Sequence, residues 1–274
     1  MATWDAWVGK SQTQDDLLTP AMLNRFRATI DSDETGIIAP QAIHFALCLP
    51  EAATASLDID GHPKRGGFLP PVPLPRRMWA SSALEFHAPI QLGDAIKRVS
   101  TIATIEEKTG GSGTLVFVNV DHQTHAGGQL AVNERQTLVY RAASTAPPAQ
   151  IGTGTPTFES WQWHRAITPS EALLFRFSAI TFNTHRIHYD RPYAEAEEGY
   201  RGLVVHGPLT ATLLLDLAAR ELGYNRLKSF AFRGVSPAIC GEVLHLVGKV
   251  DDEKITLAAL GSDGRDVMTA VAAL

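Results

Sequence analysis

The sequence predicts an α+β protein of two similar halves, each an antiparallel sheet curled around one apolar helix. The pattern Pro-x-x-x-Gly-acid occurs twice, at Pro89–Asp94 and Pro237–Glu242, 148 positions apart (237 minus 89). After each copy come three runs rich in Val, Ile and Thr, separated by Gly- and Asp-rich turns, which is typical of an antiparallel meander. Before each copy lies an apolar segment with helical character.

The elements of the first half begin with a helix expected at Pro40–Leu49, because Pro is favoured in the first turn of a helix. An aromatic strand is expected at Ala83–His87. The three runs of the meander then follow the motif, and they are Ala95–Glu106, Thr114–Gln123 and Gln129–Arg141.

The second half repeats this order. Its helix is expected at Pro208–Leu222, where Leu209, Leu213 and Leu217 recur every four residues on one face. An aromatic strand, Leu227–Phe232, leads to three runs, which are Val243–Val250, Lys254–Leu260 and Asp266–Ala272. A Pro/Gly/Ser/Thr stretch without periodicity separates the halves. We therefore expect domains at residues 1–145 and 161–274, with residues 146–160 as the linker.

Composition excludes several classes of protein. The chain has 274 residues with 45% hydrophobic and 19% charged residues, the mix of a globular protein. A net charge of −5 gives no basic footprint for nucleic acid. No stretch approaches the length of a membrane span, and residues 1–10 do not form a secretory signal. Cys48 and Cys240 form no CxxC pair and are interpreted as buried thiols of a reducing compartment. We expect a cytoplasmic protein without nucleic-acid or membrane partners.

The segment before the second helix gathers hydrogen-bonding and proton-transfer groups. Within nine positions stand Asn183, His185, Arg186, His188, Tyr189, Asp190 and Arg191. Because an imidazole can both take and return a proton near neutral pH, this segment is the expected place of the chemistry. The spacing His185-x-x-His188 invites a zinc interpretation, but no matched third ligand or Cys pair accompanies it, and we expect no metal.

Three stretches carry a resemblance to a known family: Gly67–Ala80, Phe175–Asp190 and His206–Leu209. With them the chain resembles the MaoC-like hydratase/dehydratases, and in particular the branch of mesaconyl-C4-CoA and itaconyl-CoA hydratases and mitochondrial-type 3-hydroxyacyl-thioester dehydratases. The likeness covers nearly the whole chain. It implies a double hot-dog fold, with a catalytic second half and a first half that shapes the tunnel. It also implies an acyl-CoA substrate, no separate cofactor and a homodimer.

The resemblance assigns a catalytic set of His188, Asn183 and Gly207. R-specific enoyl-CoA hydratases of the wider family carry Asp-x-Asn-Pro-x-His; aligned on the histidine, this pattern places His188 on the acid–base residue and Asn183 where the aspartate would stand. Asn183 cannot titrate, so it is expected to hold the water or to orient the imidazole. The N–H of Gly207, at the start of the long helix, is the expected donor to the enolate-like oxygen.

Arginines are the expected determinants of substrate choice. A guanidinium fork near the site segment suits a substrate carboxylate, which points to Arg186, Arg191 or Arg201. Arg76 and Arg77 are candidates for the CoA phosphates. The full set of expected substrate-binding residues is His185, Arg186, Tyr189, Arg201, His206, Leu209, Arg76 and Arg77.

The favoured function is hydration of an unsaturated acyl-CoA, above all mesaconyl-C4-CoA or itaconyl-CoA to citramalyl-CoA. A 3-hydroxyacyl-thioester dehydratase of fatty-acid metabolism is the first alternative. A hot-dog acyl-CoA thioesterase is a second, with Asp190 or Glu171 as the acidic group. A non-catalytic acyl-CoA-binding module is a third, suggested by the non-titrating Asn183.

Overall fold

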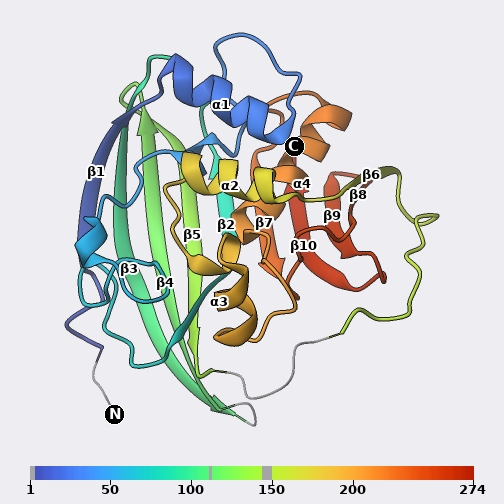
Figure 1. Ribbon diagram of the computed structural model, residues 1–274. Coiled ribbons are helices and arrows are strands. Elements are labelled where there is room, and N and C mark those ends of the chain that lie inside the picture. The colour runs from blue at the N-terminus through green and yellow to red at the C-terminus, as the bar shows by residue number, and fades with distance from the viewer. Residues whose placement is uncertain (1–3, 111–112, 144–149) are drawn as a thin grey trace.

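The strands form one continuous antiparallel sheet. The structure, a computed structural model, describes residues 4–110, 113–143 and 150–274. The order of the ten strands is β1-β3-β4-β5-β2-β7-β10-β9-β8-β6 (Figure 1). The strands of the first half are β1 (Ser11–Leu17), β2 (Arg76–Phe86), β3 (Ala95–Gly110), β4 (Gly113–Ala126) and β5 (Gln129–Arg141). Those of the second half are β6 (Trp163–Ile167), β7 (Ser229–Gly234), β8 (Leu244–Asp251), β9 (Lys254–Gly261) and β10 (Asp266–Ala273).

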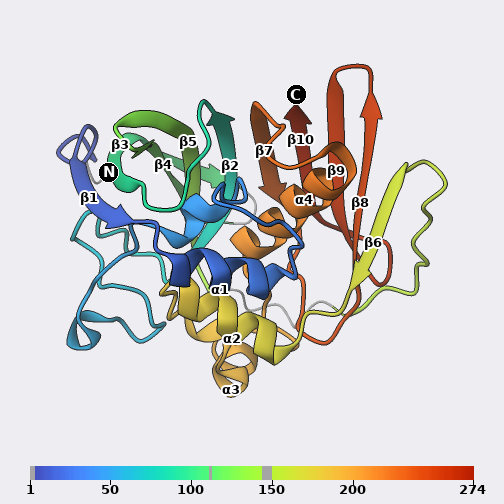
Figure 2. The same cartoon turned by 90° about the horizontal axis from the view of Figure 1, so that it is seen from above.

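The two halves meet where β2 pairs with β7, with Ser82 opposite Phe232. Seen from above, β1–β5 and β6–β10 form two groups on either side of this junction (Figure 2). The helix α4 (Gly207–Leu222) packs on β6, β8 and β9 through leucines such as Leu213 and Leu217. The two meanders and this long helix confirm the predicted plan. β1 and β6 are edge strands that the sequence analysis missed.

The repeated Pro-x-x-x-Gly-acid motif builds the same turn in both halves. Gly93 and Gly241 both have a left-handed φ, 89° and 84°, which glycine adopts without strain. Upstream of each glycine the chain makes the same backbone contact. The N–H of Ala39 donates to the carbonyl of Ile90, and the N–H of Val205 donates to that of Ala238, both at 2.9 Å. The halves are therefore structural repeats as well as sequence repeats.

The helix predicted at residues 40–49 was wrong. Only a short 3-10 helix, η1 (Ile43–Ala46), forms there, although the segment is buried as expected. Two features stop a longer helix. Cys48 has a left-handed φ of 51°, and Leu49 precedes a proline, which disfavours the α conformation. The central helix of the first half is thus reduced to one turn.

The remaining helices cover one end of the sheet. α1 (Pro20–Ile30) and α2 (Glu171–Ile180) lie side by side, capped by the hydroxyls of Thr19 and Ser170. Short helices are η2 (Thr54–Ser56), η3 (Arg186–His188) and α3 (Arg191–Ala196). Within the described ranges, none of the helices has the length and apolar character needed to cross a bilayer.

Candidate active site

The predicted site segment is the turn that follows α2. Phe182 takes a left-handed φ of 48° and reverses the chain, and the N–H of Asn183 returns to the carbonyl of Ser178 at 2.9 Å. The side-chain oxygen of Asn183 accepts the backbone N–H of His185 at 3.0 Å, an Asx turn that leads into η3. Because this oxygen is occupied, Asn183 offers its Nδ2 as a donor.

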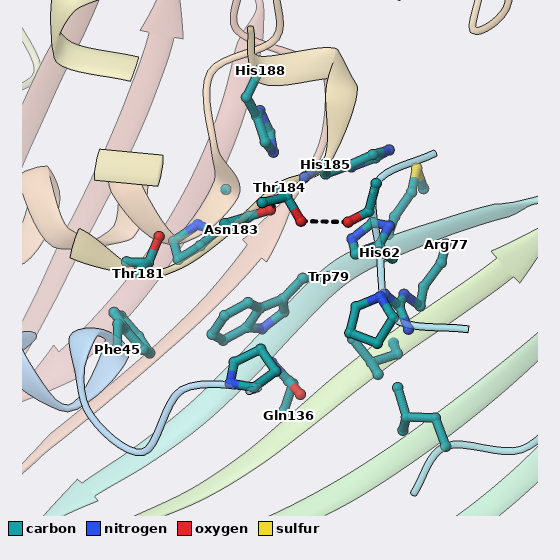
Figure 3. Close-up of a pocket in the computed structure, with 18 of the residues that line it drawn as sticks. Phe45, His62, Arg77, Trp79, Gln136, Thr181, Asn183, Thr184, His185 and His188 are labelled. Carbon is teal, nitrogen blue, oxygen red and sulfur yellow. Dashed lines mark hydrogen bonds between the residues drawn. The ribbon is translucent and has the colours of Figure 1, made fainter. Parts of the chain in front are cut away.

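A loop of the first half clamps this turn from the other side. The N–H of Arg186 donates to the carbonyl of Asp60 at 2.9 Å, and the Thr184 hydroxyl donates to the carbonyl of Gly61, the bond drawn in Figure 3. A Cβ at Gly61 would lie 1.8 Å from the Thr184 carbonyl oxygen, and the φ there is +89°. Only glycine fits this contact, so the first half fixes the position of the site in the second.

His188 is held in one tautomer. Its Nδ1 lies 2.7 Å from the carbonyl of Val204. Because a carbonyl can only accept, Nδ1 carries the proton, and Nε2 is left with a free lone pair. The side chain is 7% exposed and lines the pocket. Burial, with His206 next to it, holds the pKa of His188 well below its usual value of 6.5. His188 is therefore a neutral imidazole with an unshared nitrogen, as a general base requires.

His206 supports His188 from behind. The two rings stack with centroids 3.6 Å apart and 20° between their planes. His206 is 0% exposed, and its Nε2 is 2.8 Å from the Ser178 hydroxyl. Burial and His185 lower the pKa of His206 to about 3. The structure thus places His206 beneath the His188 ring, outside the pocket lining.

His185 belongs to a second polar cluster beside the site. Its Nε2 is 3.4 Å from a Glu198 oxygen, which also binds Arg76 at 2.8 Å. On its other side the His185 ring packs on that of His62, with centroids 4.1 Å apart. Asp60, His62 and His185 place potential metal-ligand atoms within 4.8 Å of one another. Asp60 already binds the His62 Nδ1 at 3.0 Å, however, so these groups also satisfy one another without an ion.

The amino terminus of α4 opens into the same pocket. Gly207 and Pro208 line it, while Leu209 is fully buried below. The 16 residues of α4 place the positive end of the helix dipole at Gly207. A developing oxyanion next to this N–H would be stabilised.

The pocket is a cavity of about 990 Å³ that runs from this turn into the first half. Figure 3 shows the Asn183 amide and the His188 and His185 rings around one part of it, and Trp79, Phe45 and Gln136 around another. This volume is at the upper end of ordinary ligand pockets. The loop around His62 was missed in the sequence analysis, since its contact with residues 183–188 spans more than a hundred residues of chain.

Most of the arginines expected in the site are paired elsewhere. Arg186 binds Asp190 and lies over the Tyr193 ring, 4.0 Å from its centroid. Arg201 forms a two-bond pair with Glu242. The cavity lining includes Arg77, which lies next to His62. It does not include Arg186, Arg201, Tyr189 or Arg76. Near His185 and His188, Asp190 pairs with Arg186, and the potential metal-ligand atoms that lie together are those of Asp60, His62 and His185.

Comparisons with known proteins agree with this geometry. The family model of hydroxyacyl-thioester dehydratase type 2 matches residues 42–240. The chain is 39% identical to a mesaconyl-C(4)-CoA hydratase of Chloroflexus aurantiacus over 100% of its own length and 98% of that protein. A solved MaoC-like dehydratase superposes with a TM-score of 0.76 at 16% identity, covering 99% of both chains. A Mycobacterium tuberculosis protein with a double hot-dog fold superposes with a TM-score of 0.61 at 12% identity, covering 97% of this chain and 95% of that one. The predicted double hot-dog fold is confirmed.

Proposed function

The chain belongs to the hydroxyacyl-thioester dehydratase type 2 family and is a hydro-lyase of acyl thioesters, and from this we propose that it adds water to mesaconyl-C4-CoA to give citramalyl-CoA. The observation that carries the proposal is the neutral His188, whose free Nε2 shares the pocket with Asn183 and the start of α4. The second half, residues 161–274, supplies this chemistry. The first half, residues 1–145, shapes the cavity.

The reaction uses these groups in sequence. The thioester oxygen lies against the N–H of Gly207, where the helix dipole stabilises it as it becomes enolate-like. The Asn183 Nδ2 donates to the oxygen of the attacking water. The Nε2 of His188 takes a proton from that water as its oxygen bonds to Cβ, and the resulting imidazolium returns the proton to Cα. No net proton is gained or lost.

Two features support a dicarboxylic substrate. The relative that covers the whole chain is a mesaconyl-C(4)-CoA hydratase. In addition, the cavity is cationic. Its lining includes four arginines without a carboxylate within 4.0 Å among the described residues, and they are Arg65, Arg77, Arg98 and Arg141. Arg77 is also placed to meet a CoA phosphate. Itaconyl-CoA would give the same product, but its double bond is not conjugated with the thioester, so His188 would have to return the proton to the methylene carbon instead of Cα.

The alternative is the reverse reaction on a monocarboxylic 3-hydroxyacyl thioester, which the family's description favours. The same residues would then act in reverse, with neutral His188 removing the Cα proton.

The test is the loss of enoyl-thioester absorbance with mesaconyl-C4-CoA and crotonyl-CoA in parallel, with product mass confirming hydration. We expect turnover of the dicarboxylic thioester and a fall of about 10³-fold in kcat for His188→Ala, the usual contribution of a general acid–base group. His87→Ala, an exposed first-half histidine with a 42% exposed side chain, is the control and should change kcat less than twofold. Preference for crotonyl-CoA would move the enzyme to fatty-acyl substrates. Full activity in His188→Ala would overturn the mechanism.

A further inference from the structure

The wall of the cavity in the first half is polar where a fatty-acyl tunnel would be apolar. Successive inward positions of β3, β4 and β5 bring polar side chains to one patch, and these are Arg98, Ser100, His122, Glu134 and Gln136. Ser100 stands opposite His122, and His122 opposite Glu134. The Ser100 hydroxyl is 2.7 Å from the His122 Nδ1. Figure 3 shows Trp79 between Asn183 and Gln136, so the indole lies along the route from the site to this wall.

Arg98 is the cation of this wall and is only partly satisfied by the protein. Its Nε donates to the Thr124 hydroxyl at 3.3 Å, and its Nη2 donates to the carbonyl of His44. A guanidinium has five N–H donors, and both of these acceptors are neutral. Among the residues that the structure describes, no carboxylate lies within 4.0 Å of Arg98.

Among the described residues, the groups packed around Arg98 do not form an ion pair with it. Burial, with Arg98 itself, lowers the pKa values of His44 and His122 to about 3, so both rings are neutral. Burial raises the pKa of Glu134, although the Ser82 hydroxyl that its oxygen accepts and the charge of Arg98 both act in the opposite direction. Asp16, on neighbouring β1, accepts the backbone N–H groups of Leu17 and Cys48 instead. A half-buried cation without a counter-ion is costly unless a ligand supplies one.

We propose that Arg98 binds the carboxylate of a dicarboxylic acyl group and thereby selects this substrate class against fatty-acyl thioesters. The proposal rests on the proposed acyl-thioester site but assigns substrate choice to the first half. An alkyl tail against this wall would desolvate the guanidinium without pairing it. A carboxylate would complete the fork with two charge-assisted hydrogen bonds.

The experiment compares the binding of two saturated thioesters that cannot be hydrated. Succinyl-CoA and butyryl-CoA have the same chain length and differ in a terminal carboxylate against a methyl group. Calorimetry on the wild type should give at least about tenfold tighter binding of succinyl-CoA, the range of a hydrogen bond to a charged group. Arg98→Gln, which keeps an N–H donor for the His44 carbonyl, should bring the ratio below about twofold. Arg98→Lys, which keeps the charge, should give an intermediate ratio. Arg186→Gln, an arginine outside the cavity, is the control and should leave the ratio unchanged.

The outcomes separate this proposal from the proposed function. A wild type without preference for succinyl-CoA overturns the assignment, and this result does not depend on the folding of any variant. Loss of the preference in Arg77→Gln but not in Arg98→Gln overturns it in favour of the other cavity arginine. If the preference depends on Arg98 but no unsaturated thioester is hydrated, the carboxylate site stands and the hydratase proposal fails. If mesaconyl-C4-CoA is hydrated while Arg98→Gln keeps the preference, the hydratase stands and this site does not.

Discussion

The two halves differ in the length of the segment after their first helix. In the first half, residues 31–37 join α1 to a bridge at Ile38, which pairs with Gln91. In the second half, residues 181–203 join α2 to the equivalent bridge at Val204, which pairs with Ile239. The longer connection carries Asn183, His188, η3 and α3. Both halves thus share the same framework, and the proposed catalytic groups lie on a connection that is longer in the second half.

The halves also differ in what fills their sheets. α4 has 16 residues and covers the strands of the second half, whereas η1 spans four residues in the first. The sheet of the first half is longer, with 16, 14 and 13 residues in β3, β4 and β5. A long sheet with a reduced helix leaves room on its concave side, and the cavity lining includes Val120 and Leu138 of this face. In the proposed mechanism, one half therefore holds the reacting atoms, and the other supplies space and polarity.

The contact between the two halves at Gly61 and Thr184 provides the strongest test of this division of roles. Gly61→Ala should have the largest effect, because its Cβ would lie 1.8 Å from the Thr184 carbonyl oxygen. We expect roughly 3–5 kcal/mol less stability, as for other severe steric changes. A fall of at least about 100-fold in kcat should follow, since displacing a catalytic group by ~1 Å costs that much. Denaturant unfolding and steady-state kinetics measure both.

Gly93→Ala is the matched control, because Gly93 also has a φ of +89° but nothing within 4 Å of an added Cβ. It should lose only the roughly 1–2 kcal/mol of a left-handed non-glycine residue. Equal losses in the two variants would show that backbone strain, rather than the contact with Thr184, fixes the site.

Asn183→Ala should have the next largest effect. It tests whether the longer connection of the second half contributes a group that binds the water. It removes the Nδ2 donor to the water and the Asx turn at His185. We expect a fall of about 100-fold in kcat, typical for one positioned donor. Asn183→Ser, whose hydroxyl can also cap the His185 N–H, should recover the melting temperature but not kcat. Recovery of both would assign Asn183 a structural role only.

The strands were predictable from sequence, whereas the contacts across the chain were not. The runs ending at Gln123 and Val250 were placed to within a few residues, because Gly- and Asp-rich turns bound them. The prediction of a helix at residues 40–49 was wrong because Cys48 adopts a left-handed conformation. A cysteine in the sequence gives no sign of this conformation.

The site residues divide in the same way. His188 and Asn183 stand in one local segment, and a resemblance over that segment located them. Arg186 and Arg201 were expected at the substrate because their partners, Asp190 and Glu242, could not be known before folding. Arg98 sits in an ordinary strand pattern, and only the closing of the sheet brings it to the cavity.

Acid should lower the stability of both halves, whereas the pH profile of the activity should show no titration at the ordinary pKa of histidine. The pKa of His188 lies well below 6.5, and that of His206 is about 3, as it is for His44 and His122 in the first half. Between about pH 3 and 6.5 the unfolded chain binds more protons than the folded one. Stability therefore rises with pH in this window by up to about 1.4 kcal/mol per pH unit for each such histidine, and is level above it. Unfolding measured from pH 4 to 8 checks this.

For activity, kcat/KM should stay flat from pH 6 to 8, because His188 is neutral throughout. A decline with an apparent pKa near 6.5 would contradict the buried, neutral imidazole. His206→Phe keeps a ring under His188 and removes one of the four buried histidines named above. The free energy of unfolding of this variant should fall less steeply as the pH is lowered.

The smallest effect is expected at an arginine of the second half. Arg186 is paired with Asp190 at 2.7 Å and lies outside the cavity, with a side chain 33% exposed. Such an ion pair near the surface adds little to stability. Arg186→Gln should therefore lower the melting temperature slightly and leave KM for a dicarboxylic thioester within twofold of the wild type. A rise of tenfold or more in KM would place the substrate carboxylate on the segment that carries His188. Substrate choice and chemistry would then share one half, and the division between the halves would fail.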